Sequence, residues 1–481
     1  MMVIITQIKV TKMLNYKKLG FKAGLEIHQQ LDTKKLFCSC PSILNKKEAP
    51  NLIVRRKLRA VAGLSGEKDI AALHEQQKDL TFNYEFYHDC NCLVELDESP
   101  PEEINKEALK IALQISLLLK AKIVPKIKVM RKIVIDGSNV SGFQRTMLIA
   151  KNGKIKTSKG IVKIPAIFLE EEAAKKIKTV DKEVTYRLDR LGIPLLEIAT
   201  YPDIKDPEHA KETAGIIGTI LRSAKVKRGI GSIRQDVNLS IRNSPRMEIK
   251  GFQDLKLIPK IIECEVSRLL KENPKQAEVR KAEPNLTTSF LRPLPGEARI
   301  YPETDIPEIK IDKKLLSKIK LPELITEKAL DLEREFSLHP EIAKEIIENK
   351  IDFKAFVKNY PRTSPKFLSQ ILIEMPKELK ARFNIIHKFT DMEFKEVLTL
   401  ADNHSLQKEA VIDIMIKIVK KQKINPADYK QVSFQEIEQE IKKVIQINPS
   451  LQPNAIMGII MKKYSGKINP KEVFDLIKKL Q

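Results

Sequence analysis

The strongest constraint on the fold of this 481-residue chain is a set of isolated charges inside apolar segments. Glu26 and His28 alternate with apolar residues in GLEIH. Glu197 lies alone in PLLEIA, and Glu248 lies in RMEIK. Residues two apart share one face of a β-strand, so Glu26 and His28 are expected to project together. An uncompensated charge in such a strand is costly, so Glu197 must be paired or bind a ligand. For Glu26 and His28 taken alone, a hydrogen-bonded structural pair is the commoner arrangement.

A run of three acids, Glu170, Glu171 and Glu172, follows the apolar end of FLEEEAAKK. Such a run usually marks the solvated start of a helix. If several of the carboxylates converge instead, repulsion becomes decisive, because two like charges ~4 Å apart repel by about 4 kcal/mol at an effective dielectric constant of 20. A converging cluster would therefore need a cation. Oxygen ligands with one histidine favour Mg²⁺ or Mn²⁺ over zinc.

Four of the five cysteines form two tight pairs, Cys38 with Cys40 and Cys90 with Cys92. Four thiolates in this pattern suit a tetrahedral Zn²⁺ site, and free buried thiols are the alternative. Cys264, in a helix-like stretch, is expected to be a small core residue. The odd cysteine count and the absence of a secretory signal favour a reducing, cytoplasmic location over a disulfide framework.

The length predicts about three domains. We expect a mixed-sheet α/β (α+β) domain over residues 1–300, a connector plus an all-α helical domain over 301–405, and a small α-helical tail domain over 406–481. The net charge of +23 favours a polyanionic partner, most simply nucleic acid, although a generally basic proteome would give the same bias. The chain contains no GxxxxGK[ST] loop, which excludes nucleotide binding of the P-loop type.

Local patterns predict several elements of the first domain. Asn152-Gly153, between alternating segments, predicts a hairpin turn because both residues tolerate positive φ. The proline-rich segment 284–312 reads as an extended connector. Amphipathic helices are expected over residues 68–80, 103–122, 205–225 and 257–272.

Long motifs in this chain resemble GatE, a component of the archaeal glutamyl-tRNA(Gln) amidotransferases, in the GatB/GatE family. These motifs are GLEIHQQLDTKKLFCSCPS, RRKLRAVAG, ALHEQQKDLTFNYE, IDGSNVSGFQRTMLIA, RLDRLGIPLLEIAT, RQDVNLSIR, RMEIKGFQDLKLIP and YPETDIPEI. NAIMGIIMKKYSGKINPKEV resembles the tail that GatE shares with its bacterial relative, GatB. The resemblance covers nearly the whole chain from about residue 16.

The resemblance implies a transamidation reaction. The family uses ATP and Mg²⁺ to phosphorylate the glutamyl group of mischarged Glu-tRNA(Gln), and ammonia then displaces phosphate to give Gln-tRNA(Gln). The ammonia comes through a tunnel from an asparaginase-like glutaminase, GatD, in what is expected to be a dimer of heterodimers. The first domain would be the catalytic cradle, and the helical and tail domains would hold the tRNA.

The family's functional residues carry over to named positions. The resemblance implies these catalytic and metal-binding residues: Glu26, His28, Glu171 with its neighbour Glu170, Glu197 and Glu248. Weaker candidates for contacts to ATP or the aminoacyl end are Ser141, Gln144, Arg234 and Asn238, for which a structural role is equally compatible. The Cys38, Cys40, Cys90 and Cys92 set falls where some relatives carry zinc.

One departure from the family pattern concerns an inserted domain. GatE proteins usually carry a domain similar to one in bacterial aspartyl-tRNA synthetases ahead of YPETDIP, whereas here the chain runs straight across. Two alternatives are a non-catalytic tRNA-binding protein and a bacterial-type GatB that pairs with GatA and GatC. The carboxylates inside apolar segments favour an enzyme over a simple binder, which has no reason to bury them.

Overall fold

The computed structural model describes residues 14–44, 49–252, 254–294, 299–404, 406–425, 434–449, 451–464 and 470–480. The chain divides into two compact units, Met1–Leu324 and Ile325–Gln481. The first is a mixed α/β unit and the second is helical, which confirms the predicted fold class. The apolar start of the chain, residues 1–13, lies outside the described residues. No helix in the described part of the chain is long and apolar enough to cross a membrane.

The first unit is built on an 11-stranded sheet and a smaller sheet of four strands. The large sheet contains β1 (Lys22–Gln30), β4 (Lys122–Ile123), β6 (Val129–Ile133), β7 (Phe143–Thr157), β8 (Gly160–Glu171), β11 (Pro194–Ala199), β12 (Ile233–Ser240), β13 (Met247–Phe252), β14 (Glu278–Ala282), β15 (Thr288–Pro293) and β16 (Ile300–Pro302). The smaller sheet contains β2 (Leu52–Arg56), β3 (Thr81–Phe86), β10 (Glu183–Arg187) and β9 (Lys175–Val180). A two-stranded ribbon pairs β5 (Lys126–Ile127) with β17 (Ile309–Lys310).

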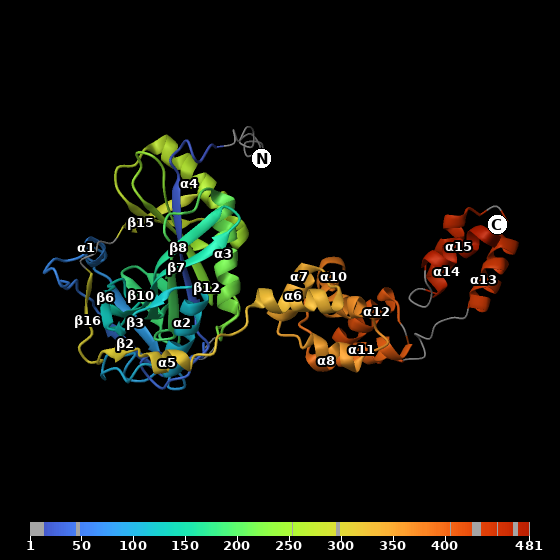
Figure 1. The fold of residues 1–481 in the computed structure, drawn as a ribbon, viewed down its shortest axis with the longest axis horizontal. Coiled ribbons are helices and arrows are strands. Elements are labelled where there is room, and N and C mark those ends of the chain that lie inside the picture. Colours follow the sequence, from blue (N-terminus) through green and yellow to red (C-terminus); the bar gives the residue numbers. More distant parts are fainter. Residues whose placement is uncertain are drawn as a thin grey trace. The chain divides into compact units, whose positions relative to one another are not determined.

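Helices predicted from sequence periodicity are present at all four expected places. In the first unit they are α1 (Ile70–Gln77), α2 (Lys106–Leu118), α3 (Pro207–Arg222) and α4 (Ile258–Glu272), and the 3-10 turn Leu255–Leu257 and α5 (Lys313–Ser317) also occur. Each of the first three begins at an Asp or Asn whose side chain accepts from backbone N–H groups of the first turn. Helices α2, α3 and α4 pack against the large sheet (Figure 1).

Strand β1 lies at the centre of the large sheet, between β11 and β12, and is antiparallel to both. Its buried residues Ala23, Leu25 and Ile27 face the helices and join the main hydrophobic core. The alternation of a strand therefore turns Glu26 and His28 to the other face of the sheet. The strand that carries the predicted site is thus held by neighbours on both edges, and its register decides which groups meet.

The two edges of the large sheet are close in sequence. The strands run in the order β15-β14-β13-β12-β1-β11-β8-β7-β6-β16, so β15 and β16 are the two edges, yet only residues 294–299 separate them in the chain. That connection reaches roughly 25 Å at full extension. Ten strands side by side in a flat sheet would span about 43 Å. The sheet must therefore curl strongly into a trough, and Figure 1 draws both edge strands on the side of the unit where α1 lies.

The proline-rich segment expected to be a connector instead supplies strands β15, β16 and β17. The prediction was wrong because prolines are tolerated in edge strands, where one side of the backbone needs no hydrogen bond. Pro293 and Pro302 both end strands at the edges of the sheet. The whole segment belongs to the first unit, which extends to Leu324 and therefore beyond the boundary expected at residue 300.

The predicted hairpin turn at Asn152-Gly153 is also wrong. Strand β7 continues through both residues, and the turn to β8 lies between Thr157 and Gly160. Asn152 has a φ of 57°, but it lies within the strand, close to a shift of register. Gly153 pairs with Ile164, and a Cβ there would lie 3.1 Å from the Leu119 carbonyl oxygen. Gly153 therefore allows the backbone of β7 to pass close to that of Leu119, and the Asn-Gly pair does not form a turn.

The second unit contains α6 (Ile325–Phe336), α7 (Pro340–Glu348), α8 (Phe353–Asn359), α9 (Pro365–Ser369), a π-helical turn (Gln370–Glu374), α10 (Met375–Phe383), α11 (Asp391–His404), α12 (Lys408–Val419), α13 (Phe434–Ile447), α14 (Pro453–Tyr464) and α15 (Pro470–Leu480). One core joins α6 to α12, and a separate core joins α13 to α15. The boundary expected after residue 405 falls between α11 and α12, whose side chains share the first of these cores.

Candidate functional site

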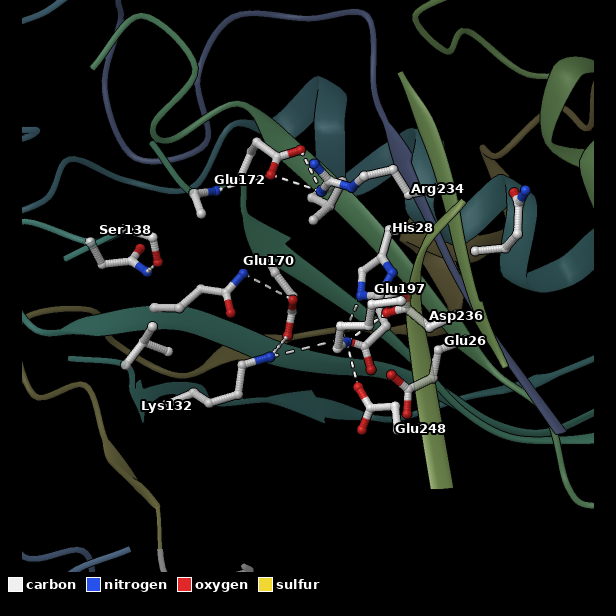
Figure 2. Close-up of a pocket in the computed structure, with 18 of the residues that line it drawn as sticks. Glu26, His28, Lys132, Ser138, Glu170, Glu172, Glu197, Arg234, Asp236 and Glu248 are labelled. Atoms are coloured by element: carbon white, nitrogen blue, oxygen red, sulfur yellow. Dashed lines mark hydrogen bonds and ion pairs between the residues drawn. The ribbon is translucent and has the colours of Figure 1, made fainter. Parts of the chain in front are cut away.

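A cavity of about 500 Å³ opens on the face of the large sheet opposite the helices. Its polar lining comes mainly from β1, β6, β8, β11, β12 and β13. Figure 2 shows Glu26, Glu170, Glu197, Asp236 and Glu248 gathered with His28 and Lys132, whereas Glu172 lies apart beside Arg234. The structure thus gathers Glu26, His28, Glu197 and Glu248, which lie up to 222 residues apart in the chain, around one cavity.

Two overlapping groups of acids could each hold a metal ion. In the first, one ligand atom each of Glu26, His28 and Glu197 lies within 4.8 Å of the others. In the second, the same holds for Glu26, Asp236 and Glu248. Glu26 belongs to both groups. The donor set, carboxylate oxygens with one imidazole, is the kind that Mg²⁺ and Mn²⁺ prefer.

The charges in this cluster change the protonation of its members. Burial, together with the nearby Glu197 and Glu248, raises the pKa of Glu26 to about 7. Burial opposes a charged His28, but the adjacent Glu197 outweighs it and raises the histidine pKa. Burial likewise opposes a charged Glu197, but Lys132 and His28 hold its pKa far below the ordinary value. At Glu26, burial and the two neighbouring carboxylates thus outweigh the positive charges of Lys250 and His28, as expected for a site that could hold a further cation.

Two lysines form ion pairs with the other carboxylates of the cavity and offset their negative charge. Lys132 pairs with Glu170, and its Nζ lies 3.8 Å from Glu197. Lys250 Nζ lies 2.6 Å from Asp236 and also pairs with Glu248. Burial alone would lower the lysine pKa, but Asp236 and Glu248 raise the pKa of Lys250. Sequence reasoning missed Asp236 and Lys250. Strand alternation could have found both, since Asp236 lies two residues from Arg234 and Lys250 lies two from Glu248.

The acid run does not start a helix; it ends β8, and all three acids are buried. Glu170 faces the cavity, where it accepts hydrogen bonds from Thr146 and Gln144. Glu171 was expected in the metal cluster, but it lines a separate small hollow and contacts Arg145. The reason is alternation, because neighbours in a strand face opposite sides of the sheet. The structure therefore brings Glu170, and not Glu171, to the cavity, although neither belongs to the two metal-binding groups.

The four weaker candidates are placed differently from one another. Arg234 lines the cavity but is bound to Glu172 by two hydrogen bonds of 2.8 Å. Gln144 also lines it, as a donor to Glu170. Asn238 donates to Glu26 over 3.3 Å, which suits a role in orienting that carboxylate. The Ser141 hydroxyl donates to the Phe143 carbonyl and lies outside the cavity lining.

The cysteine cluster differs by one member from the predicted set. One ligand atom each of Cys38, Cys40, Cys92 and Glu95 lies within 4.8 Å of the others. Cys90 is buried but does not belong to this group. Glu95 takes its place because it follows Cys92 in the same turn, where the Cys92 N–H donates to its carboxylate. A pattern of cysteine pairs alone could not reveal a carboxylate as the fourth member.

Hydrogen bonding tunes the thiols of this cluster. The Cys38 thiol donates to Glu95 over 2.9 Å. Hydrogen bonds from Cys38 lower the pKa of Cys92 to about 7, and burial raises the pKa of Cys40 to about 12. One thiolate is therefore already favoured, and a carboxylate lies beside it. Three sulfur ligands and one carboxylate oxygen are within the range that tetrahedral Zn²⁺ accepts.

A family model and several known proteins match this chain, and each of the following is of the GatB/GatE type. The family model described as the GatB/GatE catalytic domain matches residues 21–317. The glutamyl-tRNA(Gln) amidotransferase GatE protein of Methanocaldococcus jannaschii is 34% identical over 624 positions, covering 97% of this chain and 99% of the relative. The protein of the same name from Archaeoglobus fulgidus is 33% identical, with 97% and 99% covered.

The same comparison bears on the missing insertion. The GatE protein of Thermococcus gammatolerans is 34% identical over 627 positions, with 98% of this chain and 99% of the relative covered. These alignments are much longer than the 481 residues of the chain. The relatives therefore carry a large number of residues that have no counterpart here, as expected for a chain without the inserted domain.

Proposed function

This chain belongs to the GatB/GatE family and is an amidotransferase of the GatE type, and from that premise we propose that it uses ATP to convert Glu-tRNA(Gln) to Gln-tRNA(Gln). The observation that carries the proposal is the convergence of Glu26, His28 and Glu197 in one cavity, where burial and neighbouring carboxylates raise the pKa of Glu26. A protein that only binds tRNA needs no such cluster, whose burial is costly.

Mg²⁺ fits this cluster. Glu26, His28 and Glu197 would hold one ion, and Glu26, Asp236 and Glu248 offer a second or alternative group. The raised pKa of Glu26 supports this fit, because a cation beside the carboxylate would restore its charged form. When bound, the ion supplies neutralisation of the phosphate and carboxylate charges during phosphoryl transfer.

The proposed reaction has two balanced steps. A glutamyl carboxylate oxygen forms a bond to the γ-phosphorus of ATP, and ADP leaves with the electrons of the broken P–O bond. Ammonia then attacks the acyl carbon, phosphate leaves, and one of the three ammonia protons departs with the phosphate. Lys132 and Lys250 keep the surrounding carboxylates charged and in place, and Asn238 orients Glu26.

The ammonia would come from a separate protein. We propose an asparaginase-like glutaminase, GatD, as the partner in a dimer of heterodimers, in the cytoplasm, as the family resemblance implies. The relatives named above, which are GatE proteins, favour this partner over the GatA and GatC of the bacterial system. The strongly basic chain and its separate helical unit suit binding of the tRNA backbone.

A structural zinc ion beside the catalytic strand completes the proposal. Cys38, Cys40, Cys92 and Glu95 would hold it, and it would link the segment after β1 to the turn after β3. Burial of the Cys38 and Glu95 pair supports this fit, since two acidic groups in hydrogen-bond contact are stabilised by a cation. Lys35 Nζ, 3.3 Å from Glu95, would orient that ligand.

The test is amidation in the absence of any glutaminase. The purified protein, Glu-tRNA(Gln), ATP, Mg²⁺ and an ammonium salt should yield Gln-tRNA(Gln) and ADP. Labelled ATP should transfer its γ-phosphate to the mischarged tRNA when ammonia is withheld. A protein that binds the tRNA but transfers no phosphate would be a non-catalytic binder, and the proposal would be wrong.

A further inference from the structure

Five acids of the cavity lining have basic partners among the protein's own residues. Glu170 and Glu197 lie by Lys132, and Asp236 and Glu248 lie by Lys250. Glu172 is bound by Arg234, with Arg190 at 3.9 Å. The lysines and arginines of these pairs are therefore occupied with charges of the protein itself.

Three further arginines line the same cavity without such a partner. Arg246, Arg292 and Arg299 form no ion pair with any residue that the structure describes. Arg292 and Arg299 are half-buried, whereas Arg246 is exposed. A guanidinium group that is half-buried and unpaired loses hydration without compensation. The part of the cavity lining formed by these three arginines, which we call the arginine wall, therefore favours an anion.

The curl of the sheet brings two of these arginines to one cavity. Arg292 lies in β15 and Arg299 directly precedes β16, at opposite edges of the sheet. Both are anchored by the backbone: Arg292 pairs with Val279, and the Arg299 carbonyl accepts from the Ile133 N–H over 2.8 Å. Their positions are therefore set by the sheet.

We propose that Arg292 and Arg299, with Arg246 at the rim, hold the polyphosphate of the nucleoside triphosphate. The inference rests on the proposed function and assigns residues to its nucleotide. The γ-phosphate must reach the carboxylate cluster, so the rest of the polyphosphate needs positive charge elsewhere in the cavity. Guanidinium groups bind phosphate oxygens through paired N–H donors. This wall would take the place of the absent P-loop.

The chemistry favours a nucleotide over the tRNA backbone as the ligand. Arg246, Arg292 and Arg299 line one cavity of about 500 Å³, a size typical of small-molecule sites. A polyphosphate concentrates its charges at adjacent phosphorus atoms, whereas RNA spreads one charge over each nucleotide. The reacting end of the tRNA would enter with its ester-linked glutamyl group, which carries no phosphate.

Binding of a non-hydrolysable ATP analogue with Mg²⁺, measured by calorimetry, tests the assignment. Arg292→Ala and Arg299→Ala should each weaken binding by about tenfold or more, the usual loss for a charge-assisted hydrogen bond. Arg292→Lys should recover part of the affinity. Arg242→Ala, an exposed arginine outside the cavity lining, is the matched control and should bind as the unaltered protein does.

The steady-state KM values for ATP and for Glu-tRNA(Gln) separate the two phosphate sources. We expect the KM for ATP to rise in both alanine variants and the KM for the tRNA to stay unchanged. A rise confined to the tRNA would overturn the assignment to the nucleotide, as would unchanged analogue binding in folded variants. If the unaltered protein bound no ATP analogue at all, the ATP step of the proposed function would be wrong. That outcome can be told apart from failure of the arginine assignment, in which the unaltered protein and the variants bind the analogue equally well.

Discussion

His28 and Glu197 are register partners on the adjacent antiparallel strands β1 and β11, and the His28 Nε2 lies 3.4 Å from the Glu197 carboxylate. Each side chain is 15% exposed, and both reach the cavity. The pairing depends on the register of the sheet. A slip of one residue would turn Glu26 and His28 into the hydrophobic core and bring Leu25 and Ile27 to the cavity.

Glu197→Gln should lower the rate of Gln-tRNA(Gln) formation by about 100-fold or more, because it removes a charge at the centre of the site. The binding of tRNA should be nearly unchanged, since the side chain lies inside the cavity. Amidation assays and filter binding measure the two effects. Glu208→Gln, at an exposed position of α3, serves as the control. Normal turnover by the Glu197 variant would exclude this carboxylate from the chemistry.

Removal of Mg²⁺ with a chelator should abolish phosphoryl transfer. The affinity for Mn²⁺, used in place of Mg²⁺, should depend on the residues of the acidic cluster. Electron paramagnetic resonance can measure Mn²⁺ binding without any turnover. Glu26→Gln should weaken the binding most, since Glu26 belongs to both acid groups. Glu171→Gln should bind Mn²⁺ like the unaltered protein, because this side chain lies outside the cluster. Equal loss in both variants would contradict the placement of Glu171 outside the cluster.

Purified protein should contain about one zinc per chain. Elemental analysis should find the metal lost in Cys92→Ser and retained in Cys90→Ser, because only Cys92 belongs to the four-ligand group. The two variants form a matched pair, since the residues lie two apart. Zinc loss in both variants would favour the four-cysteine arrangement expected from the sequence.

Glu303 should contribute a stability that depends on pH. It is 4% exposed and accepts hydrogen bonds from Arg131 at 2.6 Å and Arg145 at 2.8 Å. Burial alone would raise the pKa of Glu303, but the two arginines and the Asp305 N–H hold it below the ordinary value of 4.5. Such a group stabilises the fold fully above its unfolded-state pKa, and this contribution is lost as the pH falls through the lower folded-state value.

Glu303→Gln should therefore cost about 3 kcal/mol of unfolding free energy near neutral pH, because it removes a buried negative charge that pairs with both Arg131 and Arg145. The difference from the unaltered protein should narrow as the pH falls below 4.5 and vanish only below the lower folded-state pKa, where the native glutamate also becomes neutral. Denaturant titrations at a series of pH values measure this difference. Asp305→Asn, whose partner Arg131 is 3.5 Å away, should change stability little. A difference that stayed constant with pH would exclude ionisation of Glu303 as its source.

Alternation in short segments predicted much of the site. It placed Glu26 with His28, and it marked Glu197 as a group that needs a partner. It failed at the acid run because three consecutive acids give no alternation, so only the pairing of β8 with β7 and β11 decides that Glu170 faces the cavity. The arginine wall could not be foreseen, since it depends on the curl that joins the edges of the sheet.

The central position of β1 also has a consequence for synthesis on the ribosome. Glu26 pairs with Ala199 on one side and Asp236 on the other, so the strand emerges long before either neighbour exists. The first part of a nascent chain therefore holds Glu26 and His28 with no sheet around them and no core to cover Leu25 and Ile27. At about 5–20 residues per second, this exposure lasts on the order of ten seconds or more. Chaperone binding during translation should concentrate on this interval, which ends when β12 has left the exit tunnel.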